Sequence, residues 1–249
     1  MPHNLNPVIL IPARMQAQRF PGKPLADISG KPMILHVLEQ AKKTGIQDIF
    51  VAAGDEEIKT VVENAGFSCV LTDPNHPSGS DRIYEALTTI DPNNHHKIII
   101  NLQGDLPVFN PQILIDLLKA FQNPHVDVAT PVILFGKNED PKDPNRVKAA
   151  VSWRTNQKYG RALYFSRGLI PYNSKDYYHH IGIYAYRRQV LEKFISLPVG
   201  YLEKQEGLEQ LRALEAGMWI EAVQIQDALF SVDILEDLEV VQRYLTHQK

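Results

Sequence analysis

The sequence of 249 residues is long enough for one large α/β domain with a packed core. Hydrophobic residues make up 44% and charged residues 22%, as in ordinary soluble proteins, so the core needs neither disulfides nor a structural metal. The net charge of −3 argues against a nucleic-acid-binding protein, which usually presents a basic face.

The cysteine content and the N-terminus indicate a compartment. Cys69 is the single cysteine, so no intramolecular disulfide can form, and a reducing compartment fits. Its place in the run Cys69–Leu71 predicts a small buried apolar side chain. The first apolar run, Val8–Ile11, is far too short for a signal peptide or a membrane span. We therefore expect a cytoplasmic protein that does not associate with membranes.

The first half of the chain alternates short apolar runs with helical patterns. Strands that are apolar throughout and separated by helices predict a parallel sheet covered on both faces. The predicted strands are 8–11, 49–52, 68–71 and 98–102, and the predicted helices are 33–41, 83–90 after an N-cap at Ser80, and 113–121 after Pro111.

The middle of the chain lacks long helical patterns. Its predicted strands, 126–132, 147–153, 162–165 and 181–186, indicate added antiparallel strands or a small sheet-rich lobe. A helix over 202–217 with a glycine cap and a C-terminal helix over 235–245 complete the prediction. The result is a mixed, mainly parallel α/β sheet flanked by helices, in a single domain over 1–249. We expect the stretch around 126–190 to form a subregion of that domain.

The loop after the first strand carries the strongest chemical signal. It contains Arg14, Arg19 and Lys23, with Gly22 allowing close backbone approach. Ligands of open parallel sheets bind beyond the carboxyl ends of the strands, and these cations suit a triphosphate. The spacing matches neither a Walker A loop nor a dinucleotide glycine motif. The other interpretation is a solvated basic loop.

The same loop resembles the N-terminal signature of the CMP-Kdo synthetases, where Kdo is 3-deoxy-manno-octulosonate. The matching stretch is PARMQAQRFPGKPLADISGKPMILHVL. Further segments resemble later motifs of that family in the same order: His76–Arg82, Asn101–Pro107, Ala162–Arg167, His180–Tyr184 and Leu208–Arg212. The resemblance implies a Rossmann-like nucleotidyltransferase fold, and transfer of CMP from CTP to the anomeric hydroxyl of Kdo. It also implies that the reaction releases pyrophosphate and that CMP-Kdo supplies lipopolysaccharide synthesis. A homodimer is implied as well, with the subregion around 126–190 serving sugar binding and dimerisation.

Two aspartates are the expected Mg²⁺ ligands. Asp105 follows the strand 98–102, where a carboxylate can hold a hard cation together with substrate phosphates. Asp233 matches the aspartate of the family's V-D-T-P-E-D-L motif, although Ile234 and Leu235 replace Thr and Pro. The catalytic residues implied by the resemblance are Arg14, Lys23, Asp105 and Asp233.

The resemblance also assigns the two substrate sites. The nucleotide site comprises Pro12, Ala13, Arg14, Arg19, Lys23, Ser78, Gly79, Ser80 and Arg82. The sugar site comprises Arg167 for the carboxylate, a group that arginine pairs with well, and Gln103, His180, Tyr184, Glu209 and Gln210 for the hydroxyls.

Two alternatives stay open at this stage. One is a nucleotidyltransferase for sialic acid or an aminated Kdo, although the block Leu208–Arg212 favours Kdo. The other is a non-catalytic nucleotide-binding regulator on the same fold. Asp55 receives no role, because it is shifted by one position from the V-A-T-D of many relatives.

Overall fold

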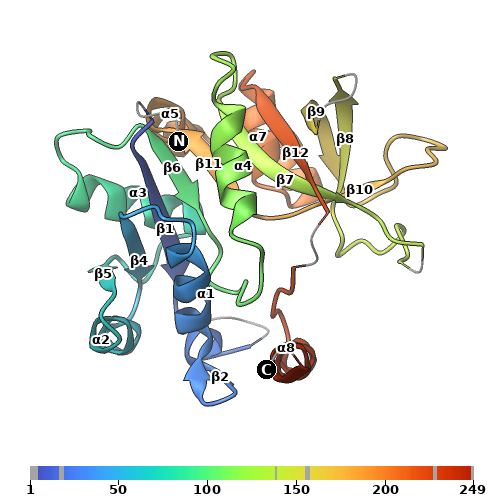
Figure 1. Ribbon diagram of the computed structural model, residues 1–249. Coiled ribbons are helices and arrows are strands. Elements are labelled where there is room, and N and C mark those ends of the chain that lie inside the picture. The colour runs from blue at the N-terminus through green and yellow to red at the C-terminus, as the bar shows by residue number, and fades with distance from the viewer. Residues whose placement is uncertain (1–4, 17–19, 138, 155–157, 227–228, 248–249) are drawn as a thin grey trace. The chain divides into compact units, whose positions relative to one another are not determined.

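The structure is a computed structural model that describes residues 5–16, 20–137, 139–154, 158–226 and 229–247 (Figure 1). The chain divides into two compact units. Unit 1 comprises Met1–Gln112 and Asp227–Lys249, and unit 2 comprises Ile113–Gln226. The prediction of a single domain over 1–249 concerns how the chain folds, which this division into compact units does not test, so it stays a prediction. None of the described helices is long and apolar enough to cross a membrane.

The strands of unit 1 form a parallel sheet in the order β6-β1-β4-β5. Their bounds are β1 (Pro7–Ala13), β4 (Ile49–Ala53), β5 (Ser68–Leu71) and β6 (Ile98–Asn101). The central strand β1 has neighbours on both edges, and Val8 to Ile11 have no exposed surface. The apolar runs of the sequence therefore predicted this sheet correctly.

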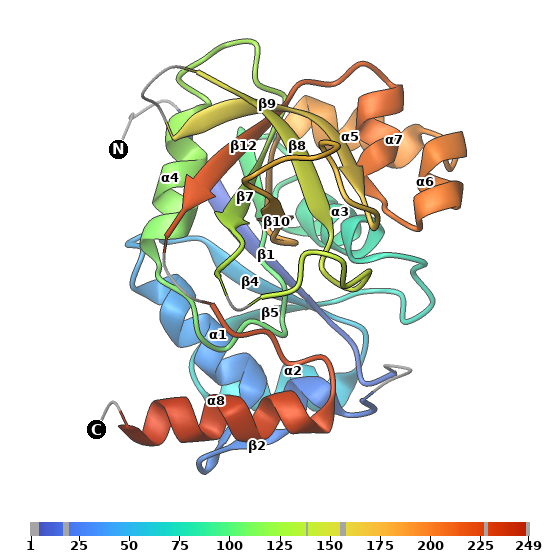
Figure 2. The ribbon, with the colours of Figure 1, turned by 90° about the vertical axis from the view of Figure 1, so that its right-hand side faces the viewer.

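Helices α1 (Met33–Lys42), α2 (Glu56–Asn64) and α3 (Gly79–Ile90) connect these strands. In Figure 2, α1 and α3 lie on opposite sides of the strands, as right-handed crossovers in opposite directions along the sheet require. The predicted N-cap was wrong. Ser78 caps α3 by accepting a hydrogen bond from the Asp81 N–H, whereas Ser80 is buried within the helix.

The C-terminal segment of the chain belongs to unit 1. Helix α8 (Leu235–His247) contacts the hairpin of β2 (Asp27–Ile28) and β3 (Lys31–Pro32). The shared apolar cluster contains Ile28, Met33, Val108, Val232 and Val241. This packing holds Asp233 in the unit that also carries the basic first loop.

The strands of unit 2 run in the order β10-β8-β9-β12-β7-β11. Only β12 and β7 pair in parallel among the pairings described within this unit, and the others are antiparallel. Their bounds are β7 (Val128–Leu134), β8 (Lys148–Trp153), β9 (Tyr159–Ser166), β10 (Tyr178–His180), β11 (Tyr184–Arg187) and β12 (Ile220–Ile225). The predicted sheet-rich region is confirmed.

Two predicted elements of unit 2 are each broken in the structure. The strand expected over 181–186 is formed only in its second half, as β11, because Ile183 N donates to Ile181 O in a tight turn that separates β11 from the earlier strand β10. The helix expected over 202–217 is split into α6 (Tyr201–Glu206) and α7 (Gln210–Glu215). Gly207 ends α6 with a left-handed φ of 64°, a conformation that glycine adopts readily.

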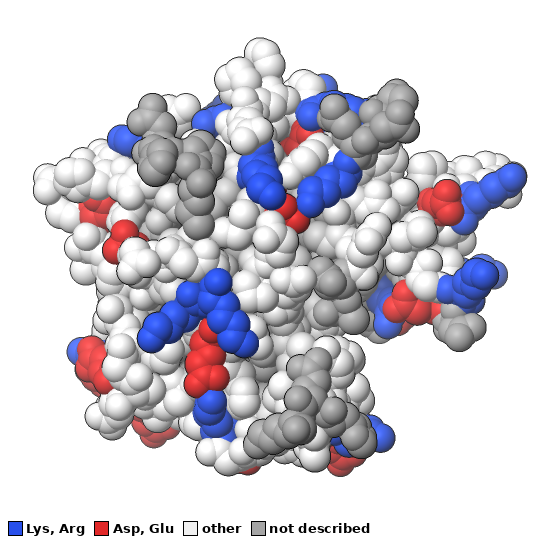
Figure 3. Space-filling model, in the orientation of Figure 1, with Lys and Arg blue, Asp and Glu red and all other residues white. Residues whose placement is uncertain are grey.

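The remaining helices are α4 (Gln112–Ala120), α5 (Arg188–Ser196) and the 3-10 turn η1 (Lys23–Leu25). Cys69 is half-buried rather than buried, because β5 is the edge strand. Burial still raises the pKa of its thiol to about 11. In the view of Figure 3, the coloured basic and acidic side chains are interspersed over the surface, as the small net charge predicts.

Candidate functional site

A cavity of about 460 Å³ opens in unit 1, beyond the carboxyl ends of β1 and β6. This is the edge at which open parallel sheets bind ligands. It is lined by Pro12, Ala13, Arg14, Phe20, Lys23, Pro24, His76, Ser78, Gly79, Arg82, Gln103, Gly104, Asp105 and Asp233. Most residues predicted for the nucleotide and the metal thus meet around one cavity.

Lys23 lies between the two predicted metal ligands. Its Nζ is 2.7 Å from Oδ2 of Asp105 and 3.7 Å from Oδ1 of Asp233. The 3-10 turn η1 presents Lys23, and Gly22 before it has a left-handed φ of 74°. The two carboxylates therefore converge on one point, although they lie 128 positions apart in the sequence.

Local hydrogen bonds place Asp233. The carboxylate of Asp237 accepts from the N–H groups of Asp233 at 2.8 Å and of Ile234 at 3.0 Å. Val232 N in turn donates to Asp105 O at 2.9 Å. The aspartate is thus fixed at the start of α8, even though Ile234 and Leu235 depart from the Thr-Pro of the family motif.

The donor set fits Mg²⁺. Two converging carboxylates supply hard oxygen ligands, and Mg²⁺ commonly binds one or two protein carboxylates together with substrate phosphates and water. No cluster of three or more histidine, cysteine or acidic side chains able to hold a metal occurs within the described part of the chain. The described residues therefore do not form a site in which protein side chains alone coordinate the metal.

The first loop is held by contacts within unit 1. Met15 N donates to Oδ2 of Asp55 at 2.8 Å, and Gly22 N donates to Met15 O at 2.9 Å. The exposed Arg14 directs Nη1 toward His76 O at 3.5 Å. Arg19, predicted for the same loop, lies outside the described residues. Asp55, which received no role from the sequence, therefore anchors the loop.

The loop before α3 is braced by two residues of that helix. Buried Arg82 donates to Thr72 Oγ1 at 2.7 Å and to Pro74 O at 3.2 Å. Burial, followed by the charge of Arg14, lowers the pKa of Arg82. Glu85 accepts from Asp73 N at 2.9 Å and pairs with Nε2 of His76. Arg82 thus lines the cavity and also supports it.

The serines of this segment have different positions. Ser78 lines the cavity at the N-terminus of α3, where its hydroxyl also donates to Asp81 Oδ2 at 2.7 Å. Ser80 is 1% exposed and is not among the lining residues. Helix geometry turns Ser80 toward the interior, so the structure does not bring it together with the other predicted nucleotide ligands.

Of the predicted sugar residues, Gln103 belongs to unit 1 and lines the cavity, with its Nε2 donating to Asn101 Oδ1 at 3.1 Å. The others belong to unit 2. There, the ring of His180 lies 5.5 Å from that of Tyr184, and its Nδ1 is 3.5 Å from Nε2 of Gln210. Burial, followed by the charge of Glu209, raises the pKa of Tyr184. His180, Tyr184, Glu209 and Gln210 thus form one polar cluster.

Arg167, predicted for the sugar carboxylate, is exposed and braced by main-chain carbonyls. Its guanidinium donates to Glu206 O at 2.9 Å, Pro144 O at 3.0 Å and Gly207 O at 3.4 Å. Its own carbonyl accepts from the buried Lys148 at 2.5 Å. Three hydrogen bonds use only part of the five-donor guanidinium, so donors remain for a ligand.

The sequence reasoning missed several supporting residues, namely Asp55, His76, Glu85, Lys148 and Asp237. Most act through hydrogen bonds to a neighbouring loop rather than through a motif. His76 could have been found, because it begins the segment His76–Arg82 that the family resemblance already included.

Comparisons with known proteins agree with one another. The family profile described as Cytidylyltransferase matches residues 8–223. The 3-deoxy-manno-octulosonate cytidylyltransferase of Paramagnetospirillum magneticum is 50% identical over 235 residues, covering 94% of this chain and 96% of the relative. The protein of that name from Rhodospirillum rubrum is 47% identical, with coverages of 94% and 93%.

A solved structure gives the same result. It is that of CMP:2-keto-3-deoxy-manno-octonic acid synthetase complexed with CTP, which is similar to this chain with a TM-score of 0.88. The sequence identity is 38%, and the alignment covers 98% of this chain and 99% of the other.

Proposed function

Because the chain belongs to the 3-deoxy-manno-octulosonate cytidylyltransferase family, we propose that the cavity of unit 1 binds CTP with Mg²⁺. The chain is an enzyme that transfers CMP from CTP to the anomeric hydroxyl of Kdo, giving CMP-Kdo and pyrophosphate. The observation that carries the site assignment is the convergence of Asp105 and Asp233 on Lys23 inside this cavity.

CTP is a strongly anionic ligand, and the cavity offers matching groups. Arg14 and Lys23 supply positive charge for the phosphates, and the arginine fork can take two oxygens at once. Ser78 and Gly79 lie at the N-terminus of α3, where main-chain N–H groups favour an anion. Pro12 and Ala13 end β1 and form the adjoining wall.

Asp105 and Asp233 would hold Mg²⁺, which would act as a Lewis acid and offset negative charge on the reacting phosphate. Lys23 then moves from its carboxylate partners to the phosphates. Its present contacts support this exchange, because the same side chain already reaches the point where both carboxylates meet.

The reaction is a single in-line displacement. The anomeric C2 oxygen of Kdo forms a bond to the α-phosphorus of CTP, the bond to the bridging β-phosphate oxygen breaks, and the hydroxyl proton passes to water. Arg14 and Lys23 offset charge that accumulates on the α-phosphate and the leaving pyrophosphate. Nε2 of His76 pairs with Glu85, and we assign no proton transfer to His76.

The acceptor sugar needs a carboxylate receptor and several hydroxyl partners. We propose Arg167 for the carboxylate and Gln103, His180, Tyr184, Glu209 and Gln210 for the hydroxyls. The clustering of the last four in unit 2 supports this assignment.

The wider setting follows from the product. We propose that the enzyme works in the cytoplasm, where CTP is available, and that CMP-Kdo supplies lipopolysaccharide synthesis. We also propose a homodimer, formed through the sheet-rich region around 126–190. A molar mass from light scattering near twice the chain mass of 28.2 kDa would support the dimer, and the single mass would overturn it.

Pyrophosphate release with Mg²⁺ and CTP tests the proposed function. Kdo, sialic acid and 8-amino-Kdo serve as parallel acceptors. Release with Kdo well above the other two is expected. Release with another acceptor in its place would keep the mechanism and change the substrate. If no acceptor gave pyrophosphate release, a non-catalytic nucleotide-binding regulator would be the better interpretation.

A further inference from the structure

Thr130 lies on β7 at the base of the polar cluster of unit 2, and its side chain has no exposed surface. Its Oγ1 is 2.8 Å from Ile183 O, 3.2 Å from Ile181 O and 2.9 Å from Nε2 of His180. Carbonyl oxygens only accept hydrogen bonds, so the single hydroxyl proton of Thr130 points to one of them. The hydroxyl oxygen must therefore accept from the ring of His180.

This contact determines the tautomer of His180. Burial, and then the neighbouring His179, lowers the pKa of His180 to about 3, so the ring is neutral at physiological pH. A neutral imidazole carries one proton, and the contact with Thr130 places that proton on Nε2. Nδ1 is then a lone-pair acceptor.

The acceptor at Nδ1 faces the amide of Gln210. Nε2 of Gln210 lies 3.5 Å from Nδ1 of His180, and Gln210 is 7% exposed. An amide group has its donors on nitrogen and its acceptor on oxygen. With the nitrogen directed to His180, Oε1 of Gln210 points away from the ring and can accept from a ligand.

Two aromatic rings pack against the ring of His180. The ring packs edge-on against Phe165 at 4.8 Å and beside Tyr184 at 5.5 Å. The main-chain N–H of His180 donates to Val147 O at 2.8 Å. In this packed position, the hydrogen bond with Thr130 selects the tautomer.

We propose that Thr130 is a positioning residue for the sugar substrate: its hydroxyl fixes the tautomer of His180, which orients Gln210 so that Oε1 accepts a sugar hydroxyl. This inference rests on the proposed function, because it takes Kdo as the ligand of the cluster. Thr130 touches no substrate and acts through His180.

The test compares Thr130→Val, which keeps the shape and removes the hydroxyl, with Thr130→Ser, which keeps the hydroxyl. Nitrogen-15 NMR of labelled histidines reads the tautomer, and the signal missing in His180→Asn identifies His180. We expect a protonated Nε2 in the wild-type enzyme and in Thr130→Ser, and a mixed or inverted tautomer in Thr130→Val.

Steady-state kinetics supply the second measurement. Loss of one well-placed hydrogen bond is expected to raise KM for Kdo about tenfold in Thr130→Val, while KM for CTP changes less than about twofold. Thr130→Ser should restore KM for Kdo. Thr44→Val is the matched control, because Thr44 is buried in unit 1 and its hydroxyl bonds Ala41 O; its KM for Kdo should equal that of the wild type.

A protonated Nδ1 in the wild-type enzyme would overturn the proposal, as would an unchanged KM for Kdo in folded Thr130→Val. If Thr130→Val does not fold, Gln210→Glu replaces it. A carboxylate cannot donate to Nδ1, so KM for Kdo should rise about tenfold in this variant too. An unchanged KM for Kdo would contradict the proposal that His180 orients Gln210. The NMR experiment uses no substrate, so failure of the wild type to use Kdo is a separate result.

Discussion

The ammonium nitrogen of Lys23 lies 2.7 Å from Oδ2 of Asp105, in a pair whose side chains are 16% and 28% exposed. The residue expected to bind phosphate thus pairs with the residue expected to bind metal. Asp233 adds a second carboxylate at 3.7 Å. Such partial burial strengthens electrostatic interactions relative to bulk water, so the three side chains are expected to respond together to CTP and Mg²⁺.

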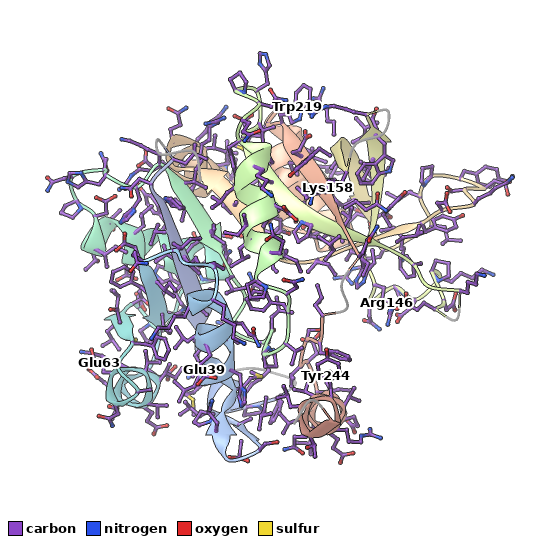
Figure 4. The ribbon with its side chains drawn as sticks, in the orientation of Figure 1. Glu39, Glu63, Arg146, Lys158, Trp219 and Tyr244 are labelled. Carbon is purple, nitrogen blue, oxygen red and sulfur yellow. The ribbon has the colours of Figure 1, made fainter. Side chains whose placement is uncertain are left out.

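Replacing Lys23 by alanine should lower turnover by about 100-fold or more, because a cation at the reacting phosphate stabilises the transition state by several kcal/mol. Steady-state pyrophosphate release measures the effect, and circular dichroism checks the fold. Lys31→Ala is the control, since Lys31 forms an exposed pair with Glu39 on α1 (Figure 4) that is worth about 1 kcal/mol or less. Turnover near normal in Lys23→Ala would remove Lys23 from the mechanism.

Asp105→Asn and Asp233→Asn should each raise the Mg²⁺ concentration needed for half-maximal activity by about tenfold or more. A neutral amide attracts a hard cation less than a carboxylate does. Calorimetric titration of CTP with and without Mg²⁺ gives a second readout. The charge-removing control Glu63→Gln, at an exposed position of α2, should leave both unchanged. A Mg²⁺ requirement that stays at its wild-type value in both aspartate variants would refute the metal assignment.

Asp55→Ala should raise KM for CTP by about tenfold or more, since the loop loses the acceptor of the Met15 N–H and a hydrogen bond to a charged group contributes about 1.5 kcal/mol or more. The fold and kcat should change little. The neighbouring exposed Glu56 supplies the control variant Glu56→Ala. An equal KM for CTP in both variants would mean that the loop needs no such anchor.

Glu203→Gln should lower the free energy of unfolding at neutral pH by about 2 kcal/mol. Glu203 and Arg212 are each 11% exposed, and Arg212 donates to both carboxylate oxygens at 2.8 and 2.6 Å. Burial opposes ionisation, yet the hydrogen bonds from Arg212 and from Gly200 N hold the pKa of Glu203 below its usual 4.5.

The difference in unfolding free energy between the wild type and Glu203→Gln should depend on pH, because the pKa of Glu203 is lowered in the folded state. A carboxyl whose pKa is lower in the folded state stabilises the protein fully above the unfolded-state pKa and loses this contribution as the pH falls through the folded-state value. Denaturation of both proteins from neutral pH to about pH 4 should therefore show the difference shrinking toward acid. A difference in unfolding free energy that stays constant with pH would mean that Glu203 stabilises the fold through packing and not through its charge. Glu192→Gln, in a more exposed pair with Arg188, should differ little from wild type at any pH.

The parallel sheet of unit 1 could be predicted because a short run that is apolar throughout, such as Val8–Ile11, is typical of a strand buried on both faces of a sheet. The cavity residues Lys23 and Asp105 could be predicted because each lies in the segment that follows a strand of the parallel sheet. The break at Gly207 was missed, since a helical pattern of apolar residues continues on both sides of it. Periodicity does not report where the backbone turns.

The supporting contacts could not be read from the sequence for a different reason. Asp55 binds the backbone of Met15, 40 positions earlier, and Thr130 binds His180, 50 positions later. Both side chains have common local roles as a cap and as a strand residue. Only the fold brings them to their partners, so no spacing along the chain identifies them.

Phosphorus-31 NMR of the complete reaction tests the central claim most directly, because it observes the bond that forms. With Mg²⁺, CTP and Kdo, the account predicts that the CTP signals are replaced by equal amounts of pyrophosphate and of a CMP phosphodiester joined to the sugar. Unchanged CTP, or cleavage of CTP without a phosphodiester that depends on Kdo, would contradict it.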